Sequence, residues 1–393
     1  MGCNPPPVIG SLAVTQLTLR DFRCHRSLRL DLRAASVVVV GANGTGKTSI
    51  LEALSLLTPG RGLRRARMAD ILRAEAAATA ETWSVRALLD TPTGPTELVT
   101  IFAGEAAGGR DRRRIHIDGQ MVRDRARLAQ TAGVIWLTPE MDGLFGGSPS
   151  VRRRFLDRLV WGVDPAHAGR VAAYERALQQ RSILLRRDSF DALWLNAVEA
   201  TMAEHAVAVA AARKQIASQM SAIAQAGHDG FPGAIIDVQG SVEGWLDDAP
   251  ALAVEDRLRD ELARCRDQDA QGGGASVGPH RSDLKVVHVA NRRPAEACST
   301  GEQKMLLIAL VFAGARLQRR ERGASPLLLL DEVIAHLDER HRRAVFDAVA
   351  DLAAQAWYAG CDPVPFQPLE GMSQAVCLDE LQSAAGPKRG FDA

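Results

Sequence analysis

The residues best suited to chemistry lie in a glycine-rich segment, residues 41–49, with the sequence GANGTGKTS. It matches the phosphate-loop pattern G-x-x-x-x-G-K-[ST] at every fixed position. Glycines let backbone N–H groups turn toward a phosphate, and the following helix N-terminus adds partial positive charge. Lys47 would reach the β- and γ-phosphates, and the Thr48 hydroxyl would hold Mg²⁺. The predicted nucleotide-binding residues of the loop are Gly41, Ala42, Asn43, Gly44, Thr45, Gly46, Lys47, Thr48 and Ser49.

The flanking segments predict the elements that position this loop. Residues 35–40 form a β-branched run without a polar face, which is typical of a buried parallel strand. In residues 50–57 the apolar side chains follow helical spacing and leave Glu52 and Ser55 facing away. An ordinary strand-to-helix turn is the alternative interpretation, but the strand–loop–helix order favours nucleotide binding.

A second candidate strand, residues 326–332, has the sequence PLLLLDE. A fully apolar strand of a parallel sheet places the acids that follow it at the carboxyl edge, beside a bound nucleotide. We expect Asp331 to hold Mg²⁺, usually through water, and Glu332 to orient or deprotonate the water that attacks the γ-phosphate. Lys47 and Glu332 are therefore the candidate catalytic residues. Apolar strands that end in an acid are common, so residues 326–332 indicate a nucleotide site only because the chain also has the phosphate loop.

Residues 298–304, with the sequence CSTGEQK, precede an apolar helix predicted over residues 305–317. Ser299 can cap this helix, and Gly301 allows close approach to the backbone. The segment would thus form a second helix N-terminus suited to a phosphate. A simple N-cap is the alternative interpretation.

Composition places the chain among ordinary globular proteins. It has 393 residues, of which 46% are hydrophobic and 24% charged, enough for two or three domains. No apolar run is long enough to span a membrane and no secretory signal is present, which predicts a cytoplasmic protein. The six cysteines are scattered without a C-x-x-C pair, so neither a zinc site nor a disulfide framework is indicated.

The net charge of +1 gives no global sign of nucleic-acid binding, and the clustering of arginines is more informative. One cluster lies in a glycine-interrupted segment after the loop helix, and the other in residues 110–114. Either could contact phosphate, although a charge run is more often a solvated surface. The candidate DNA contacts are Arg61, Arg64, Arg65, Arg112, Arg113 and Arg114.

Patterning along the chain predicts an α/β protein with an insertion. Strands are expected at residues 12–19 and 28–32, and three more in an antiparallel layer within residues 83–123. Residues 150–225 have helical spacing and few glycines, residues 227–247 look loop- and strand-like, and residues 271–274 read as a linker. The predicted division is a nucleotide-binding lobe in two halves, residues 1–149 and 271–393, around a helical lobe at residues 150–270.

The motifs of the last third resemble those of a known class of ATPase. The pattern S-x-G-E-Q-K, then L-L-L-L-D-E, then residues 335–338 (AHLD), resembles the signature motif, Walker B and D-loop of ABC-type ATPase heads in chromosome-maintenance and DNA-repair proteins. Within that class the chain is most similar to the RecF family of bacterial recombination mediators. The matching segments are residues 17–23, 48–54, 60–64, 136–140, 147–157, 174–185 and 278–284. The implied fold is a P-loop ABC-type head with an antiparallel β-layer and an inserted helical lobe, without a long coiled coil.

The resemblance also implies a function. Members of the family dimerise when ATP is bound, each ATP lying between Lys47 and Thr48 of one subunit and Ser299 and Gly301 of the other. They bind DNA at gaps and at junctions of single and double strands, and work with RecR and RecO to load RecA, supporting replication-fork repair and the SOS response. Slow hydrolysis would release the DNA. By resemblance, Arg23 lies near the phosphates, Asp338 acts across the dimer seam, and residues 138–142 couple the γ-phosphate to the helical lobe.

The chain departs from the family pattern in places. Met141 intervenes before Asp142 where an acid is usual, and residues 359–362 are Ala-Gly-Cys-Asp where Thr-Gly-Thr-Asp is expected. The second change removes hydroxyl groups from the expected γ-phosphate switch. Many relatives carry Asp where Glu332 stands, and because Glu is the better-placed base in ABC heads, hydrolysis could be faster here.

Two other classes share these motifs. A transporter-type ABC ATPase would be a compact domain of about 200 residues, which the long split insertion argues against. A structural, SMC-like head that uses ATP mainly as an assembly switch needs the same residues with little turnover. Purification without membrane extraction tests the first, and comparison of ATPase rate with ATP-dependent dimerisation tests the second.

Overall fold

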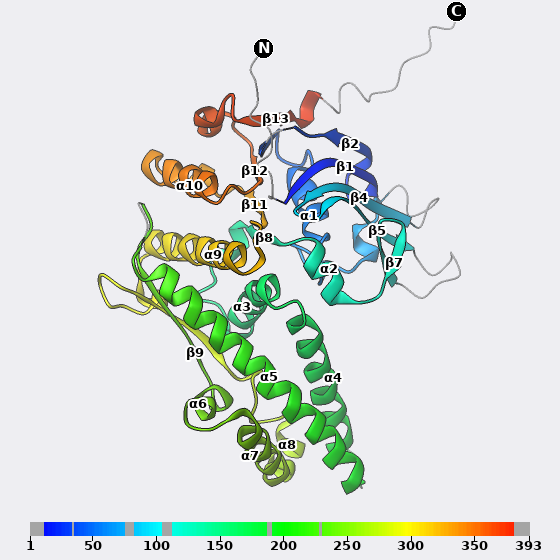
Figure 1. Ribbon diagram of the computed structural model, residues 1–393, viewed down its shortest axis with the longest axis vertical. Coiled ribbons are helices and arrows are strands. Elements are labelled where there is room, and N and C mark those ends of the chain that lie inside the picture. The colour runs from blue at the N-terminus through cyan, green and yellow to red at the C-terminus, as the bar shows by residue number, and fades with distance from the viewer. Residues whose placement is uncertain are drawn as a thin grey trace, which may run out of the picture. The chain divides into compact units, whose positions relative to one another are not determined.

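The computed structural model describes residues 12–33, 35–74, 82–103, 112–186, 191–227 and 230–380 (Figure 1). The chain forms two compact units: unit 1 comprises residues 1–139 and 318–393, and unit 2 comprises residues 140–317. Residues 271–317 thus belong to unit 2, whereas the sequence predicts that residues 271–393 form one half of the nucleotide-binding lobe. That functional division stays a prediction.

The centre of unit 1 is a five-stranded parallel sheet in the order β13-β3-β12-β11-β8. The strands β3, β11 and β12 are buried on both faces almost throughout, which is why their sequences are continuously apolar. The strand predicted before the phosphate loop is β3, and the strand predicted to end in Asp331 is β11, so both predictions are confirmed. The bounds are β3 Ser36–Val40, β8 Val134–Leu137, β11 Leu327–Asp331, β12 Ala356–Gly360 and β13 Ser373–Cys377.

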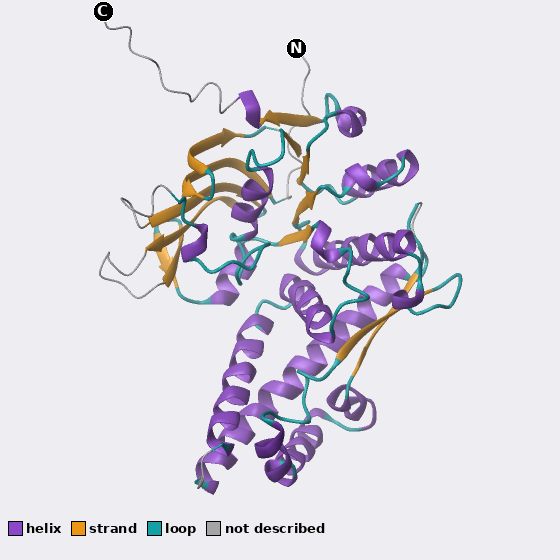
Figure 2. Cartoon of the chain, turned by 180° about the vertical axis from the view of Figure 1, so that it is seen from behind, coloured by secondary structure: helices purple, strands orange, loops and turns teal. Residues whose placement is uncertain are grey.

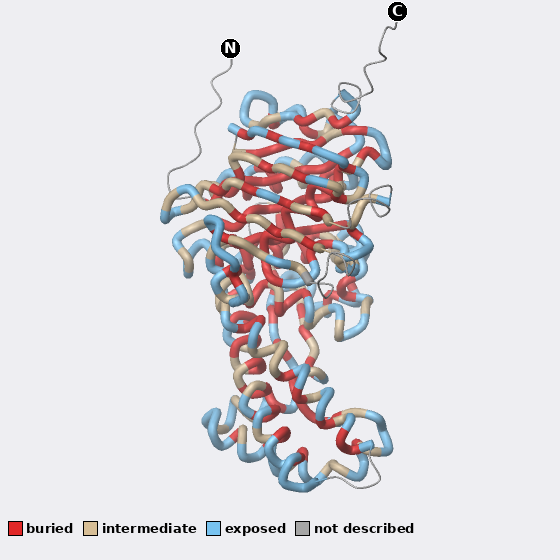
Figure 3. Tube along the Cα trace, turned by 90° about the vertical axis from the view of Figure 1, so that its right-hand side faces the viewer, coloured by how far each residue is buried: buried red, intermediate tan, exposed pale blue. Residues whose placement is uncertain are grey.

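A second, antiparallel sheet of unit 1 has the order β2-β1-β4-β5-β6-β7. Along its strands, buried positions alternate with half-buried or exposed ones (Figure 3). In β4 the buried side chains are Trp83, Val85, Ala87 and Leu89. The antiparallel layer predicted within residues 83–123 is confirmed. The bounds are β1 Ala13–Phe22, β2 His25–Asp31, β4 Thr82–Thr91, β5 Gly94–Ala103, β6 Arg112–Ile117 and β7 Gln120–Val122.

The helices of unit 1 follow the strands of the parallel sheet. α1 (Lys47–Ser55) begins at the end of the phosphate loop, and all its residues except Thr48 are buried. α10 (Glu339–Asp351) starts beyond β11, with Asp338 as its N-cap. The remaining elements are α2 Arg125–Thr131 and the 3-10 turns η1 Ala69–Ile71, η5 Ile334–His336 and η6 Val364–Leu369.

Unit 2 is mostly helical, with one two-stranded ribbon (Figure 2). α3, α4 and α5 cover the region predicted to be helical, and β9 pairs antiparallel with β10. α9 begins in unit 2 and its last residues, from 318 onward, count with unit 1. The bounds are η3 Pro139–Met141, α3 Pro149–Val163, α4 His167–Leu185, α5 Ala192–Ala224, β9 Ala234–Gln239, α6 Ser241–Asp248, α7 Ala251–Arg264, α8 Arg266–Gly272, β10 Asp283–His288, η4 Ala295–Ala297 and α9 Thr300–Arg322.

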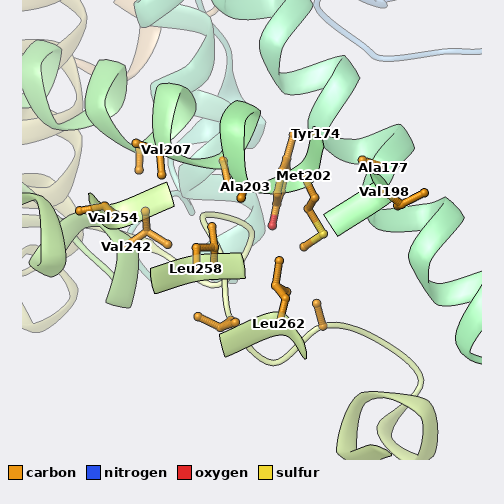
Figure 4. Packing of buried hydrophobic residues seen from close by; sticks show 14 of the residues in the cluster. Tyr174, Ala177, Val198, Met202, Ala203, Val207, Val242, Val254, Leu258 and Leu262 are labelled. Carbon is orange, nitrogen blue, oxygen red and sulfur yellow. The ribbon is translucent and has the colours of Figure 1, made fainter. Parts of the chain in front are cut away.

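An apolar core joins the helices of unit 2 (Figure 4). Tyr174 of α4 and Met202 of α5 point toward α7, where Leu258 and Leu262 lie, and all four are at most 3% exposed. Burial of such side chains is the main favourable term in folding, so this core explains how the inserted lobe holds its shape. Among the described residues, no helix is both long enough and apolar enough to cross a membrane.

Two sequence expectations for unit 2 were wrong. Residues 227–247 were expected to be loop- and strand-like; β9 lies in this range, but its last part, from residue 241 on, belongs to α6, because Val242, Trp245 and Leu246 recur at helical spacing and pack toward the core. The glycine-rich linker predicted at residues 271–274 is partly helical, since α8 continues to Gly272 and ends with Gly273 in the left-handed conformation.

Candidate nucleotide-binding site

The strand order of the parallel sheet brings three loops together. β12 lies between β3 and β11, and all three run in the same direction. The phosphate loop follows β3, Cys361 follows β12 and Glu332 follows β11, so these residues meet at the carboxyl edge of the sheet. This edge is where ligands bind in open parallel sheets.

The phosphate loop has a backbone that requires glycine. Gly44 and Gly46 have φ of 87° and 99°, in the left-handed region. A Cβ on Gly46 would lie 2.5 Å from both Cys24 Sγ and His25 Nε2, so the turn between β1 and β2 packs directly against the loop. Burial raises the pKa of the Cys24 thiol, but the hydrogen bond and charge of His25 outweigh it and leave that pKa below its ordinary value.

Lys47 lies folded over the loop that precedes it. Its Nζ donates to the carbonyl oxygens of Gly41 at 2.8 Å and Ala42 at 3.0 Å, and lies 3.9 Å from Glu332 Oε1. The side chain is only 6% exposed, so its charge acts in a shielded setting. A buried ammonium at the mouth of a glycine-rich loop is suited to phosphate oxygens.

Thr48 and Asp331 form a pair of oxygen ligands. Thr48 Oγ1 donates to Asp331 Oδ1 at 3.2 Å, joining the first turn of α1 to the end of β11. Mg²⁺ is usually held by one or two protein oxygens together with phosphates and water, and this pair fits that pattern. A cage of three or more acidic, histidine or cysteine side chains is not found among the described residues.

Glu332 is held in an unusual backbone conformation. Its φ is 52°, and its N–H donates to the carbonyl of Ala359 at 3.0 Å. A left-handed conformation is unfavourable for a residue with a side chain, and such residues concentrate at functional sites. Here the conformation carries the carboxylate toward Lys47 and Cys361, where it could orient a water molecule.

Cys361 also lies at this edge, although the sequence alone does not predict that its thiol meets Lys47 and Glu332. Its Sγ lies 3.3 Å from Lys47 Nζ, 3.3 Å from Glu332 Oε1 and 2.9 Å from Asn43 Oδ1. In the sequence, residues 359–362 stand at an expected γ-phosphate switch and depart from the family pattern there. The strand order, which places β12 between the other two strands, is the signal that would have located the thiol.

Arg23 is fixed to the helix behind the loop. Its Nε and Nη2 donate to the two carboxylate oxygens of Glu52 at 2.8 and 2.7 Å, and Nη1 donates to the carbonyl of Asp70 at 2.7 Å. Glu52 is fully buried, which makes this bidentate pair a fixed part of unit 1. The contact of Arg23 with nucleotide phosphates stays a prediction.

Ser299, in unit 2, forms a capping box at the start of α9. Its N–H and Oγ donate to Glu302 Oε2 at 2.8 and 2.9 Å, and the Glu302 N–H donates back to Ser299 Oγ at 3.3 Å. These hydrogen bonds lower the pKa of Glu302. A Cβ on Gly301 would meet no atom within 4 Å, so this helix start is open on that side.

Asp338 caps α10 in unit 1. Its Oδ1 accepts from the His341 N–H and its Oδ2 lies 2.8 Å from His341 Nδ1, and the first of these bonds is the main reason why its pKa is lowered. Its side chain is 64% exposed, so it is open to a partner. Its role across a dimer seam stays a prediction.

The two arginine clusters differ in how many of their side chains are exposed to solvent. Arg61, Arg64 and Arg65 are exposed on the segment after α1, and Arg114 is exposed on β6. Arg113 instead points inward and donates to the carbonyls of Gly60 at 2.8 Å, Thr58 at 3.2 Å and Leu56, which anchors the first cluster. The side chain of Arg112 lies outside the described residues.

Comparison with known proteins shows the family of the chain. Residues 13–358 match the model of the RecF/RecN/SMC N terminal domain. The DNA replication and repair protein RecF of Mesorhizobium japonicum is 44% identical over 369 residues, which cover 93% of this chain and 96% of the relative. The chain belongs to the RecF family. RecF of Allorhizobium ampelinum is also 44% identical, over 93% of this chain and 97% of its own length.

Solved RecF structures share the fold of this RecF-family chain. A structure of the recombination mediator protein RecF with ATPrS has a TM-score of 0.80 at 19% identity and covers 91% of this chain and 95% of that one. The corresponding RecF-ATP structure has a TM-score of 0.78 at 20% identity, covering 90% and 93%. The predicted fold class, an ABC-type head with an inserted helical lobe, is confirmed. Family membership also sets aside the transporter-type alternative.

Proposed function

We propose that this chain binds ATP and Mg²⁺ at the carboxyl edge of the parallel sheet of unit 1 and acts as an ATP-dependent DNA-binding protein in replication and recombinational repair. The observation that carries the proposal is the convergence of Lys47, Thr48, Asp331 and Glu332 from the ends of two strands that flank β12. Its family membership supports the same role, because its relatives are named DNA replication and repair proteins.

Each residue would have one task. Loop N–H groups and Lys47 would bind the β- and γ-phosphates, and Thr48 with Asp331 would hold Mg²⁺, which neutralises phosphate charge. Glu332 would orient the attacking water. Enzymes catalyse phosphoryl transfer mostly by positioning the reactants and stabilising charge. Side chains held at the fixed ends of strands are suited to both tasks.

We infer that ATP joins two copies of the chain. The exposed side of Gly301 and the capping box of Ser299 present a helix N-terminus that would receive the γ-phosphate held by the partner's loop. Asp338, exposed at the start of α10, would act at the same seam. ATP binding would therefore create the homodimer, and slow hydrolysis would dissolve it.

DNA binding would follow from dimerisation. The segment that carries Arg61, Arg64 and Arg65 is anchored by Arg113 through backbone carbonyls, so its charges are presented on a fixed support. Phosphate contacts of this kind give affinity without sequence preference, which suits gapped DNA and strand junctions. RecO and RecR would be the partners in loading RecA and in supporting the SOS response.

The experiment is a titration of gapped duplex DNA with and without ATP·Mg²⁺, using the wild-type chain and Lys47→Ala. We expect ATP to strengthen DNA binding by about tenfold or more in the wild type and to have no effect on the variant. DNA affinity indifferent to ATP would contradict the proposal. The ATPase rate, measured in parallel, distinguishes a repair ATPase from an SMC-like assembly switch, which would dimerise with almost no turnover.

A further inference from the structure

A single side chain joins α3 to β10 in unit 2. Arg152 of α3 donates from Nε and Nη2 to the two carboxylate oxygens of Asp283, at 2.6 and 2.9 Å. Asp283 is the first residue of β10, and the two side chains are only 11% and 16% exposed. A bidentate contact between a guanidinium and a carboxylate fixes orientation as well as distance, so the start of β10 is held firmly against α3.

The remaining nitrogen of the Arg152 guanidinium holds a second segment of unit 2. Its Nη1 donates to the carbonyl oxygens of Phe145 at 3.0 Å and Gly147 at 2.6 Å. The same segment is also tied to α9, because Lys304 Nζ lies 3.3 Å from Asp142 Oδ2, and the Lys304 side chain is only 15% exposed. The segment is therefore fastened to β10 through Arg152 and to α9 through Lys304.

The chain beyond β10 folds back along this strand before α9 begins. Val287 forms an antiparallel bridge with Pro294. Lys285 Nζ lies 3.2 Å from Asp283 Oδ2 and 3.7 Å from Glu296 Oε1, so η4 lies beside β10. A row of alternating charges thus runs from the start of β10 to η4, the turn that immediately precedes the capping box of α9.

We propose that Arg152 is a positioning residue for the nucleotide-receiving start of α9. This inference rests on the proposed function, because it assumes that Ser299 and Gly301 receive the nucleotide of a second subunit. The guanidinium would hold residues 142–147 and the start of β10 in one arrangement. β10 would carry that arrangement, through its bridge with Pro294, to the helix start. Arg152 itself would act through these elements and not on the nucleotide.

Arg152 contributes more to this positioning than the other charges of the row. Lys285 and Glu296 are 36% and 48% exposed, and an exposed ion pair contributes little. Arg152 is shielded, and its four hydrogen bonds reach two separate segments. A lysine there would keep the charge but could not make the bidentate contact with Asp283 and reach both carbonyls as well. The account therefore requires a guanidinium at this position.

The test mixes pairs of full-chain variants with ATP·Mg²⁺ and follows dimerisation by light scattering, at a concentration near the dimer dissociation constant of the wild type. Lys47→Ala has a defective loop and an intact receiving start, and Ser299→Arg has the reverse. Arg152→Gln is mixed with each of them. Asp283→Asn removes the other partner of the ion pair, and Arg152→Lys keeps the charge. Arg154→Gln, at an exposed site of the same helix, is the matched control.

We expect Arg152→Gln alone to dimerise about tenfold more weakly than the wild type, while its affinity for a fluorescent ATP analogue changes by less than about twofold. Mixed with Lys47→Ala it should dimerise, because its own loop is intact and the partner supplies a sound receiving start. Mixed with Ser299→Arg it should stay monomeric, because neither subunit can then receive the nucleotide. Asp283→Asn should show the same asymmetry, Arg152→Lys a weaker form of it, and Arg154→Gln should behave as the wild type does.

A general loss of packing in unit 2 has no preference between the two partners. Dimerisation of Arg152→Gln with both partners, or with neither, would therefore overturn the inference. The milder Arg152→Lys repeats the comparison and keeps the test decisive if Arg152→Gln folds poorly. If Lys47→Ala and Ser299→Arg fail to dimerise with each other while the wild type dimerises, the proposed function fails instead.

Discussion

Thr48 Oγ1 donates a hydrogen bond to Asp331 Oδ1 across 3.2 Å, so the first turn of α1 and the end of β11 are joined where Mg²⁺ is expected. Asp331→Asn keeps the size of the side chain and removes its charge. We expect ATP affinity in Mg²⁺ to fall about tenfold, while affinity measured in EDTA is unchanged, because only the metal-dependent part of binding is lost. Calorimetric titration under the two conditions measures both values.

The control for this change is Asp347→Asn, which alters an exposed aspartate of α10 in the same unit. It should bind ATP as the wild type does in both buffers. Equal loss of affinity with and without Mg²⁺ in Asp331→Asn would indicate general damage to the loop and would count against the metal assignment.

Glu332→Gln tests the assignment of the water-orienting base. The amide cannot accept the proton, so we expect the ATPase rate to fall about 100-fold, while ATP binding and dimerisation persist. Phosphate release assays measure the rate, and Glu370→Gln, at an exposed site of unit 1, is the control. Hydrolysis by Glu332→Gln at the parental rate would remove Glu332 from the mechanism.

A buried ion pair in unit 2 predicts a pH-dependent stability. Asp157 accepts from Arg213 Nε at 2.8 Å and Nη2 at 2.9 Å, and lies 2.8 Å from His167 Nε2. Burial raises the pKa of Asp157, but the charge of Arg213 and the His167 bond outweigh it and lower this pKa to about 2. Because the folded-state pKa lies below the unfolded value, the stabilisation is present above about pH 4 and is lost as the pH falls toward 2.

The lowered pKa of Asp157 should make the free energy of unfolding fall by about 2 kcal/mol between pH 5 and pH 2, because this carboxyl binds a proton more weakly in the folded than in the unfolded chain. Asp157→Asn should flatten that part of the pH dependence and lower stability at pH 7 by about 3 kcal/mol, because Arg213 is left buried without its partner. Urea unfolding at several pH values measures both effects, with Asp260→Asn on the exposed side of α7 as control. A parallel pH profile for Asp157→Asn and the wild type would contradict the account.

The exposed arginines after α1 predict a change in the salt dependence of DNA binding. Arg61→Glu with Arg64→Glu should reduce the slope of log affinity against log salt by about 2, because two phosphate contacts are lost. Arg176→Glu, an exposed site on α4, is the control. An unchanged slope in the double variant would assign the DNA surface to other residues.

The sequence predicted the parts of the site that are local. The phosphate loop, its flanking strand and helix, the strand ending in Asp331 and the antiparallel layer all depend on patterns within about ten residues, and the structure has them. What it could not predict depends on the order of strands in the sheet and on packing across it. Cys361 meets Lys47 because β12 separates β3 from β11, and Arg113 turns inward because carbonyls near Gly60 face it.

α6 is a further element that local sequence patterns did not predict. Its glycine and acidic residues weaken the local helical signal, and the burial of Val242 against the core of unit 2 decides the conformation. Tertiary packing thus overrode a weak local preference.

The most direct test of the central claim is dimerisation in a mixture of two variants, followed by light scattering with ATP·Mg²⁺. Lys47→Ala should not bind ATP and Ser299→Arg should block the surface that receives the partner's nucleotide, so neither should dimerise alone. A heterodimer of the two contains one composite site with an intact Lys47 and an intact Ser299. We predict that the mixture dimerises with ATP; a mixture that stays monomeric while the wild type dimerises would contradict a nucleotide shared between two subunits.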